Sequence, residues 1–411
     1  MTSVHVASTA PVVGTERMET LDAVRGAAVL GILLANVFAL SGFAFVAPDA
    51  YLSLPLAQLH EPLTFLIFVL IEAKFYSLFS LLFGIGFAVF ITRASARGAD
   101  AIRLFKRRLV GLMIIGLVHT FLIWMGDILL TYAVIGFALI PFVRKSDRTV
   151  LRWAAGMLLL PIVIYAALVG VMAVAGPQGL QYSAPAENAG APPAILQDSI
   201  DAFIGGTYLD VVKGNAVFTV AQVARRFILM FFPRVFAMFL LGFYVGRRNM
   251  FAELDRHLPL LRRVLLWGTV VGLPLSYCGA RLEGNSMSAP NLLGLLETTV
   301  KSIGAPALSL AYAAGLCLLF RRVDRLRGAF AAVGQMALTN YLMHSFAGIA
   351  IFYGLGFGLF GRVPLAIVLP GAVGFFAIQI LASMLWLARA KFGPAEWMWR
   401  MFTYQRRVPL F

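Results

Sequence analysis

A histidine and an aspartate in the first half of the chain have the types and spacing needed for proton transfer. His119 and Asp127 flank a short turn between two apolar segments, and a tight hairpin there would bring their side chains together. A histidine beside a carboxylate can act as a general base whose partner orients the imidazole. The same pair could instead form a hydrogen bond that only locks the turn, and both interpretations stay open.

Three polar residues form a stripe on the first apolar segment. Asp22, Arg25 and Asn36 fall on one helical face, with Arg25 and Asn36 about 16 Å apart along the axis. Ionisable groups at membrane depth cost roughly 2.5–3.5 kcal/mol on insertion scales, so they should face a partner, water or a ligand. The stripe predicts a polar path from one mouth of the protein into its interior. Asp22 and Arg25 alone could also be an interfacial ion pair.

Further charged residues interrupt later apolar segments. Glu72 and Lys74 are two positions apart, so their side chains point to different sides of a helix and each needs a partner elsewhere. Neither residue needs such a partner if the hydrocarbon core of the bilayer begins only at about Phe75 and the preceding segment lies in the interface. In the sixth segment Arg234 follows Pro233, which can kink a helix, and we expect an anionic partner or Glu72 beside the arginine.

Two polar pairs are spaced four residues apart. Asn340 and His344 lie deep in the ninth segment, where they either hydrogen-bond to a neighbouring helix or line a cavity. Glu297 and Lys301 fit a simple ion pair within one helix. His60 falls in a loop, and we expect it to be solvated.

Long apolar segments must position these residues. Of 411 residues, 60% are hydrophobic and 13% are charged. A soluble protein would be nearer half apolar and a quarter charged, so an ordinary cytosolic enzyme, a disordered chain and a disulfide scaffold are excluded. The apolar runs are too long and continuous for a barrel. We predict an all-α polytopic membrane protein with about ten transmembrane helices. The expected spans are 23–45, 63–92, 105–125, 128–144, 150–175, 226–246, 262–280, 297–320, 331–355 and 364–389.

Basic residues predict the orientation. Of the 34 lysines and arginines, 26 gather in alternate loops and in the termini, which places both termini in the cytoplasm. The net charge of +15 is then a topology signal and not a sign of nucleic-acid binding. We divide the chain into a cytoplasmic N-terminal segment (1–22), a five-helix bundle (23–175), an extracytoplasmic loop that could lie on the membrane or cap a cavity (176–225), a second five-helix bundle (226–390) and a cytoplasmic interfacial tail (391–411).

Five stretches of the sequence resemble the YeiB-like family of bacterial membrane proteins. They are residues 16–36, 74–87, 119–129, 338–345 and 392–400. The resemblance covers nearly the whole chain in order and implies a multi-pass protein of the bacterial inner membrane. The first stretch is also similar to a wider superfamily of membrane acyltransferases. This superfamily includes heparan-α-glucosaminide N-acetyltransferase, which takes acetyl groups from cytosolic acetyl-CoA.

The superfamily resemblance implies transfer of an acyl group from a cytosolic thioester such as acetyl-CoA to an extracytoplasmic or lipid-linked acceptor. One branch of the superfamily has a histidine where this chain has Asn36, so His119 with Asp127 is the candidate catalytic pair here. By the same analogy, basic residues meet the anionic groups of coenzyme A and polar residues line the passage. The candidate substrate-binding residues are Asp22, Arg25, Asn36, Glu72, Lys74, Ser77, Arg107, Arg108, Arg234, Asn340 and His344.

We expect no metal and no tightly bound cofactor, with acyl-CoA as a co-substrate. The expected partners are membrane lipids and a small-molecule or glycan acceptor, without nucleic acid, and a homodimer is compatible with the sequence. The alternative function is a transporter or exporter of a small anionic or amphiphilic molecule, in which the deep charges bind substrate or carry protons. An enzyme predicts a cavity that joins a basic mouth to His119, whereas a transporter predicts pseudo-symmetric halves.

Overall fold

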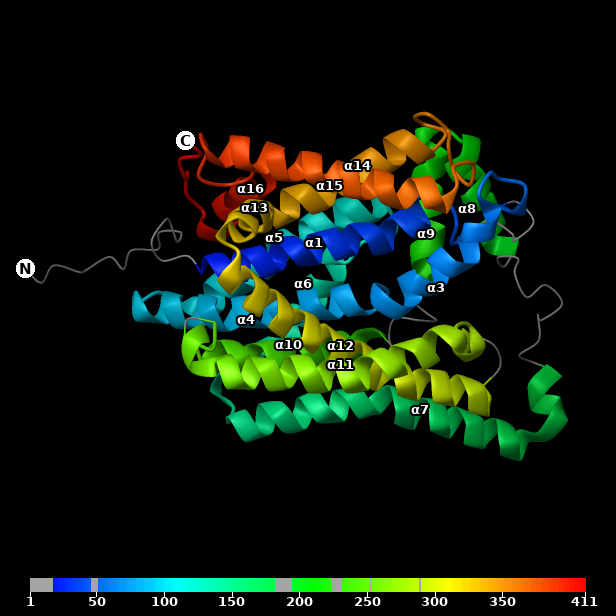
Figure 1. Ribbon diagram of the computed structural model, residues 1–411, viewed down its shortest axis with the longest axis horizontal. Helices are drawn as coiled ribbons and strands as arrows, with labels where there is room; N and C mark the ends of the chain where they lie inside the picture. Colours follow the sequence, from blue (N-terminus) through cyan, green and yellow to red (C-terminus); the bar gives the residue numbers. More distant parts are fainter. Residues whose placement is uncertain (1–17, 46–50, 182–193, 223–230, 252, 288–289) are drawn as a thin grey trace, which may run out of the picture.

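The computed structural model describes residues 18–45, 51–181, 194–222, 231–251, 253–287 and 290–411, and the regular elements of this part of the chain are helices. The main helices are α1 (Glu19–Leu40), α3 (His60–Leu70), α4 (Lys74–Ala96), α5 (Ala101–Val118), α6 (Leu129–Leu139), α7 (Asp147–Gln181), α8 (Ala194–Gly205), α9 (Tyr208–Gln222), α10 (Phe232–Arg247), α11 (Leu258–Arg281), α12 (Leu292–Arg322), α13 (Asp324–Gln335), α14 (Ala337–Phe352), α15 (Leu365–Leu387) and α16 (Pro394–Tyr404). The all-α prediction is confirmed for these residues, and most long helices run along the longest axis (Figure 1).

Several helical segments have the length and composition of membrane spans. Six are long and apolar enough to cross a bilayer: Glu19–Leu40, Ala57–Ala96, Asp147–Val174, Leu254–Arg281, Leu292–Arg322 and Leu365–Leu387. Large apolar side chains such as Val163, Trp267 and Leu385 are more than half exposed on the outside of the bundle. Such a surface suits hydrocarbon better than water. The chain therefore has the build of a helical membrane protein, and each of the ten expected spans overlaps described helical residues.

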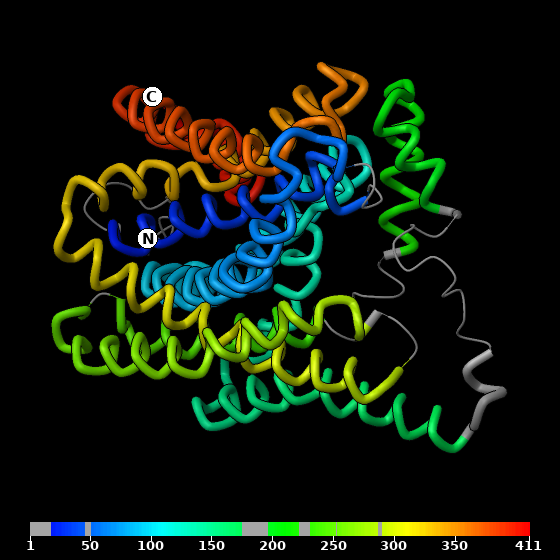
Figure 2. Tube along the Cα trace, turned by 45° about the vertical axis from the view of Figure 1, so that its right-hand side comes forward, coloured from blue at the N-terminus to red at the C-terminus, as the bar shows by residue number. Residues whose placement is uncertain are grey.

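The central helices surround α1. Figure 2 shows α1 lying between α13 and α4, while α10 packs on the other side of α4 and α7 forms the outer layer beyond α10 and α12. The two short helices α8 and α9 lie at the end of the bundle opposite the start of α1 (Figure 1). They come from the expected extracytoplasmic loop, so part of that loop is helical and covers one end of the bundle.

The second expected span, 63–92, is two helices and not one. The chain breaks between α3 and α4, where Ala73 adopts a left-handed conformation (φ 66°). The backbone N–H of Glu72 bonds to the Ile67 carbonyl, which leaves the Phe68 carbonyl without its helical donor. The ammonium group of Lys74 donates to this Phe68 carbonyl. Lys74 therefore satisfies the backbone at the break.

Three other local expectations need correction. His60 is buried and not solvated, because its ring stacks on Tyr51 with the centroids 3.7 Å apart. Pro233 lies in the first turn of α10, where a missing N–H costs no helical hydrogen bond, and not at a kink. The ninth expected span, 331–355, is divided at Met336 into α13 and α14.

The crossing of α4 and α10 depends on two glycines. A methyl group on Gly84 would lie far inside van der Waals contact with the Phe239 carbonyl oxygen, and one on Gly242 would do the same to the Leu81 carbonyl oxygen. Small residues let helix backbones approach closely inside membranes. This close approach holds the aromatic face of α4 in place, and that face lines the cavity described below.

We expect Gly84→Ala to destabilise the protein by about 1–3 kcal/mol, because the added methyl group must push α10 away. Gly86→Ala is the matched control on the same helix, since no atom of the described residues outside the backbone of α4 itself lies within 4 Å of its methyl position. The control should keep or slightly raise the stability, because alanine favours a helix over glycine. Thermal unfolding in detergent measures both. Equal unfolding temperatures for the two variants would contradict the crossing geometry.

Candidate active site

His119 begins a five-residue π-helical turn, η3 (His119–Ile123), at the end of α5. The His119 carbonyl accepts a hydrogen bond from the Trp124 backbone N–H at 2.7 Å, the wider spacing that defines a π-turn. Such turns occur frequently at functional sites. Helix α9 supplies partners for the turn: Tyr208 donates to the Leu122 carbonyl at 2.8 Å, and the Asn215 side-chain amide donates to the Ile123 carbonyl at 3.3 Å.

Asp127 lies just before α6 and holds His119. One carboxylate oxygen, Oδ2, accepts from the backbone N–H of Leu130 at 2.6 Å, in the manner of a helix cap. The other, Oδ1, lies 2.8 Å from Nδ1 of His119, and neither side chain is more than 1% exposed. The expected contact between the two residues is therefore present. The carboxylate is fixed by the helix end before it meets the imidazole.

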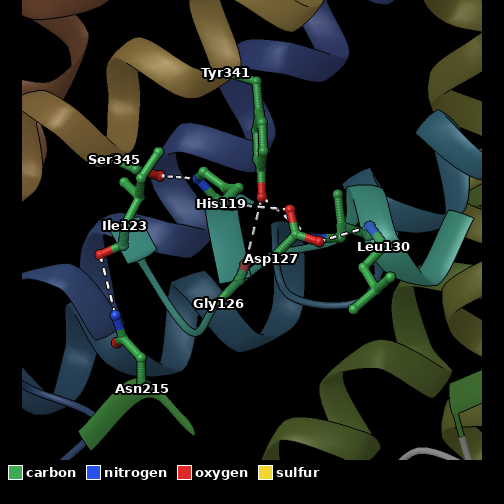
Figure 3. A network of polar contacts seen from close by, with 9 residues as sticks. His119, Ile123, Gly126, Asp127, Leu130, Asn215, Tyr341 and Ser345 are labelled. Carbon is green, nitrogen blue, oxygen red and sulfur yellow. Dashed lines mark hydrogen bonds and ion pairs between the residues drawn. The ribbon is translucent and has the colours of Figure 1, made fainter. Parts of the chain in front are cut away.

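Ser345 completes a line of three polar side chains. Its hydroxyl oxygen lies 2.9 Å from Nε2 of His119 and is wholly buried (Figure 3). An ionised Asp127 carboxylate can only accept, so with a neutral imidazole Nδ1 of His119 donates to it and Nε2 accepts from the Ser345 hydroxyl. The resulting order, serine to histidine to aspartate, has the geometry used to activate a hydroxyl nucleophile.

Tyr341 lies one helical turn before Ser345 on α14. Its hydroxyl accepts from the Ile128 backbone N–H at 3.2 Å and lies 3.4 Å from the Gly126 carbonyl (Figure 3). Its ring centroid is 5.3 Å from that of His119. Tyr341 thus ties α14 to the turn that carries His119 and Asp127.

A cavity of about 310 Å³ leads toward this site. On α4 its lining runs from Phe79 to Ala94, about 22 Å along the helix axis, and it continues to Arg97 just after the helix. One end contains five arginines: Arg25, Arg93, Arg97, Arg108 and Arg400. The other end contains Ile128, Tyr132 and Tyr341. Among the described residues, neither His119 nor Ser345 belongs to the lining, so Tyr341 separates the cavity from the buried histidine.

The tail helix α16 closes the side of the cavity. Its Trp399 donates to the Arg108 carbonyl at 2.7 Å, and the Arg108 guanidinium lies 3.8 Å from the centroid of the Trp399 ring. Its Glu396 accepts from the backbone N–H groups of Leu338 (2.7 Å) and Thr339 (3.2 Å), at the start of α14. Burial raises the pKa of Glu396, and the hydrogen bonds from Thr339 and Leu338 oppose that rise.

The structure brings together some of the residues singled out from the sequence. Asp22, hydrogen-bonded to Arg25, lines the basic end of the cavity with Arg25 and Arg108. Asn340 and His344 face α15 instead: the Asn340 amide donates to Ser383 at 3.0 Å, and His344 Nε2 lies 2.9 Å from the Gln379 amide oxygen. This is the arrangement expected of residues that join two helices.

The remaining predicted residues lie apart from the described cavity lining. Ser77 donates to the Ala73 carbonyl at 2.6 Å within its own helix, beside the break that Lys74 stabilises. The others in this group are Asn36, Glu72, Arg107 and Arg234. Glu297 and Lys301 form the expected pair at 2.6 Å, and Glu283 joins them as a second carboxylate.

Sequence reasoning missed Ser345, Tyr341 and Glu396. The spacing that identified Asn340 and His344 applies equally to Tyr341 and Ser345, one position further along α14 and about 100° around the helix. The signal was present, but nothing in the pattern shows which face turns toward His119. Glu396 lies within the expected interfacial tail, and its capping role depends on a contact across 58 residues.

The fold and the site define a polytopic helical membrane protein with a buried histidine–carboxylate pair beside a basic cavity. A family model described as "Protein of unknown function (DUF418)" matches residues 245–406. The chain is 31% identical to "Uncharacterized protein YxaH" of Bacillus subtilis (strain 168), over 98% of each chain. It is 29% identical to "Uncharacterized protein YeiB" of Escherichia coli (strain K12), over 96% of this chain and 98% of that protein. The chain belongs to the YeiB-like family, and no solved structure matches it.

We expect Glu396→Ala to lower the stability by about 1–3 kcal/mol, because it leaves two buried backbone N–H groups at the start of α14 without acceptors. Glu396→Gln should cost less, because its amide oxygen can still accept. Thermal unfolding in detergent measures the two variants against Glu253→Gln, a control at an exposed glutamate. The capping role is wrong if Glu396→Ala unfolds at the temperature of this control.

Proposed function

We propose that this protein is a transmembrane acyltransferase that takes an acyl group from an anionic cytosolic thioester such as acetyl-CoA and passes it to an extracytoplasmic or lipid-linked acceptor. The observation that carries the proposal is the cavity, which runs from an arginine-lined end to Tyr341, in contact with His119. A thioester donor with phosphate groups needs a cationic mouth and a long, mainly apolar channel. The cavity offers both.

The arginine-lined end would bind the anionic part of the donor. Guanidinium groups form paired, charge-assisted hydrogen bonds with phosphate oxygens. The cavity volume is at the lower end of the range for small-molecule sites, which suits the narrow acyl-bearing arm of a donor whose nucleotide stays at the mouth. Trp399, stacked on Arg108, adds an aromatic wall at that mouth.

We propose the cytoplasmic membrane of a bacterium as the location, with the arginine-lined end in the cytoplasm and about ten spans. The positive-inside rule supports this orientation, because the basic loops and the cavity mouth lie at the same end of the helices. The donor would then enter from the compartment where acyl thioesters are made. The acceptor would approach from the end covered by α8 and α9.

The deep charges that favoured a transporter have structural partners in this chain. Lys74 donates to a backbone carbonyl at a helix break, and Asp22 accepts from Arg25. These contacts account for their presence at membrane depth without a transported ion. They therefore favour acyl transfer over transport as the use of the cavity.

Purified protein should bind acetyl-CoA and release coenzyme A slowly by hydrolysis, and faster with a suitable acceptor. His119→Gln should lower this release by about 10²-fold or more, because a general base contributes that much, while donor affinity stays unchanged. The glutamine amide can still donate to Asp127, which protects the fold. Release of coenzyme A from labelled acetyl-CoA measures the rate. The absence of both donor binding and turnover in the unmodified protein would rule out the proposed function.

Arg93→Gln should raise KM for the donor several-fold and leave kcat nearly unchanged, because it removes binding charge far from the reacting carbonyl. Arg103→Gln is the matched control, an exposed arginine of the same end outside the described lining. Raising the ionic strength should raise KM in the unmodified protein, since salt screens such contacts. Equal KM values for the two variants would place donor binding elsewhere.

A further inference from the structure

We propose that Ser345 is the nucleophile of this site and carries the acyl group as an ester between donor and acceptor. The inference rests on the acyl transfer proposed above. Its basis is the contact of the Ser345 hydroxyl with His119 Nε2 at 2.9 Å, continued by the contact of His119 Nδ1 with Asp127 at 2.8 Å. Three separate segments, α14, the turn η3 and the residues before α6, converge to make this line.

The direction of the hydrogen bonds is the one that activation requires. Asp127 accepts the Leu130 N–H with Oδ2, and an ionised carboxylate can only accept with Oδ1 as well, so a neutral imidazole turns its Nδ1–H toward Oδ1. The lone pair of Nε2 then points at the Ser345 hydroxyl. The imidazole can take the serine proton, and the carboxylate stabilises the imidazolium that results.

A covalent intermediate also resolves the problem of two compartments. The cavity opens at the arginine-lined end, while the turn that carries His119 is covered from the opposite side by α9. Direct transfer would require donor and acceptor to meet at His119, which is wholly buried together with Ser345. With an acyl-serine, the two larger substrates do not have to be there at the same time: the donor approaches Ser345 from the cavity past Tyr341, and the acceptor approaches later from the side of α9.

The two half-reactions balance. In the first, the Ser345 oxygen attacks the thioester carbonyl, and His119 takes the hydroxyl proton. The carbon–sulfur bond then breaks, and His119 returns the proton to the departing sulfur, which gives a free thiol and an acyl-serine ester. In the second, an acceptor hydroxyl attacks the ester, and its proton passes through His119 to the serine oxygen as the ester bond to Ser345 breaks. Water in place of the acceptor gives hydrolysis.

The test is to trap the intermediate in the full-length protein. Purified protein is incubated with radiolabelled acetyl-CoA without acceptor, denatured in acid and digested, and the labelled peptide is identified by mass spectrometry. We expect an acetyl group on Ser345. Ser345→Ala should lose the label and keep donor affinity within about two-fold, and His119→Gln should slow labelling by about 10²-fold or more.

Ser309→Ala is the matched control, because Ser309 is also wholly buried and its hydroxyl has no hydrogen-bond partner among the described residues. It should be labelled on Ser345 like the unmodified protein. Ser345→Cys keeps an acylatable atom and should carry the label as a thioester, which neutral hydroxylamine removes. This variant separates loss of the nucleophile from loss of the fold.

Failure of the serine and failure of the proposed function give different results. If Ser345→Ala turns over acetyl-CoA as fast as the unmodified protein, the nucleophile proposal is wrong and acyl transfer stands. If the unmodified protein neither binds nor cleaves acetyl-CoA, the proposed function is wrong, and a fluorophosphonate probe then decides about the serine. If the probe labels Ser345 in the unmodified protein but not in His119→Gln, the result supports an activated serine hydroxyl. If the probe does not label Ser345, the nucleophile proposal is overturned.

Discussion

Backbone groups released where a helix breaks must find partners inside an apolar bundle, and this requirement organises the whole interior of the protein. An unpaired N–H or carbonyl in hydrocarbon costs several kcal/mol, so a break persists only where a side chain supplies the missing bond. The structure shows this compensation at each of the breaks described. Lys74 donates to a carbonyl at the end of α3, Glu396 accepts from N–H groups at the start of α14, and Asp127 accepts from an N–H group at the start of α6.

The same compensation produces the candidate site. Asp127 can orient His119 because its other oxygen is already held by the α6 backbone, which fixes the carboxylate in space. The turn η3 remains wider than an α-helix because α9 satisfies its carbonyls from outside. Asp127 therefore caps α6 and orients His119 at the same time. A side chain that only filled space could not replace any of these residues.

Close contacts between crossing helices fix the positions of these groups relative to one another. At the α1–α13 crossing, a methyl group on Gly334 would collide with the Asp22 carbonyl, and one on Gly26 would collide with the Phe330 carbonyl. The backbone of α1 at Asp22 and Gly26 is thus pressed against α13, the segment that leads into α14. The position of Ser345 relative to the basic mouth depends on these backbone contacts, since van der Waals packing is the main force between helices in lipid.

The sequence predicts the helices well because long apolar runs report directly on membrane length, and it predicts the His119–Asp127 contact because a short hairpin leaves little freedom. It does not predict the breaks at Ala73 and Met336: Glu72 and Lys74 show a polar interruption at the first, but nothing in the pattern shows that the backbone turns there. The sequence also does not show which face of α14 points toward His119, because the side chains on every face of this helix could pack in the interior. Which of the two i,i+4 pairs meets His119 is settled only by tertiary contacts, among them the cap that Glu396 provides from 58 residues away. The polar residues predicted at membrane depth thus include some that pair with backbone groups, some that join two helices and some that line the cavity, and only the three-dimensional contacts separate these groups.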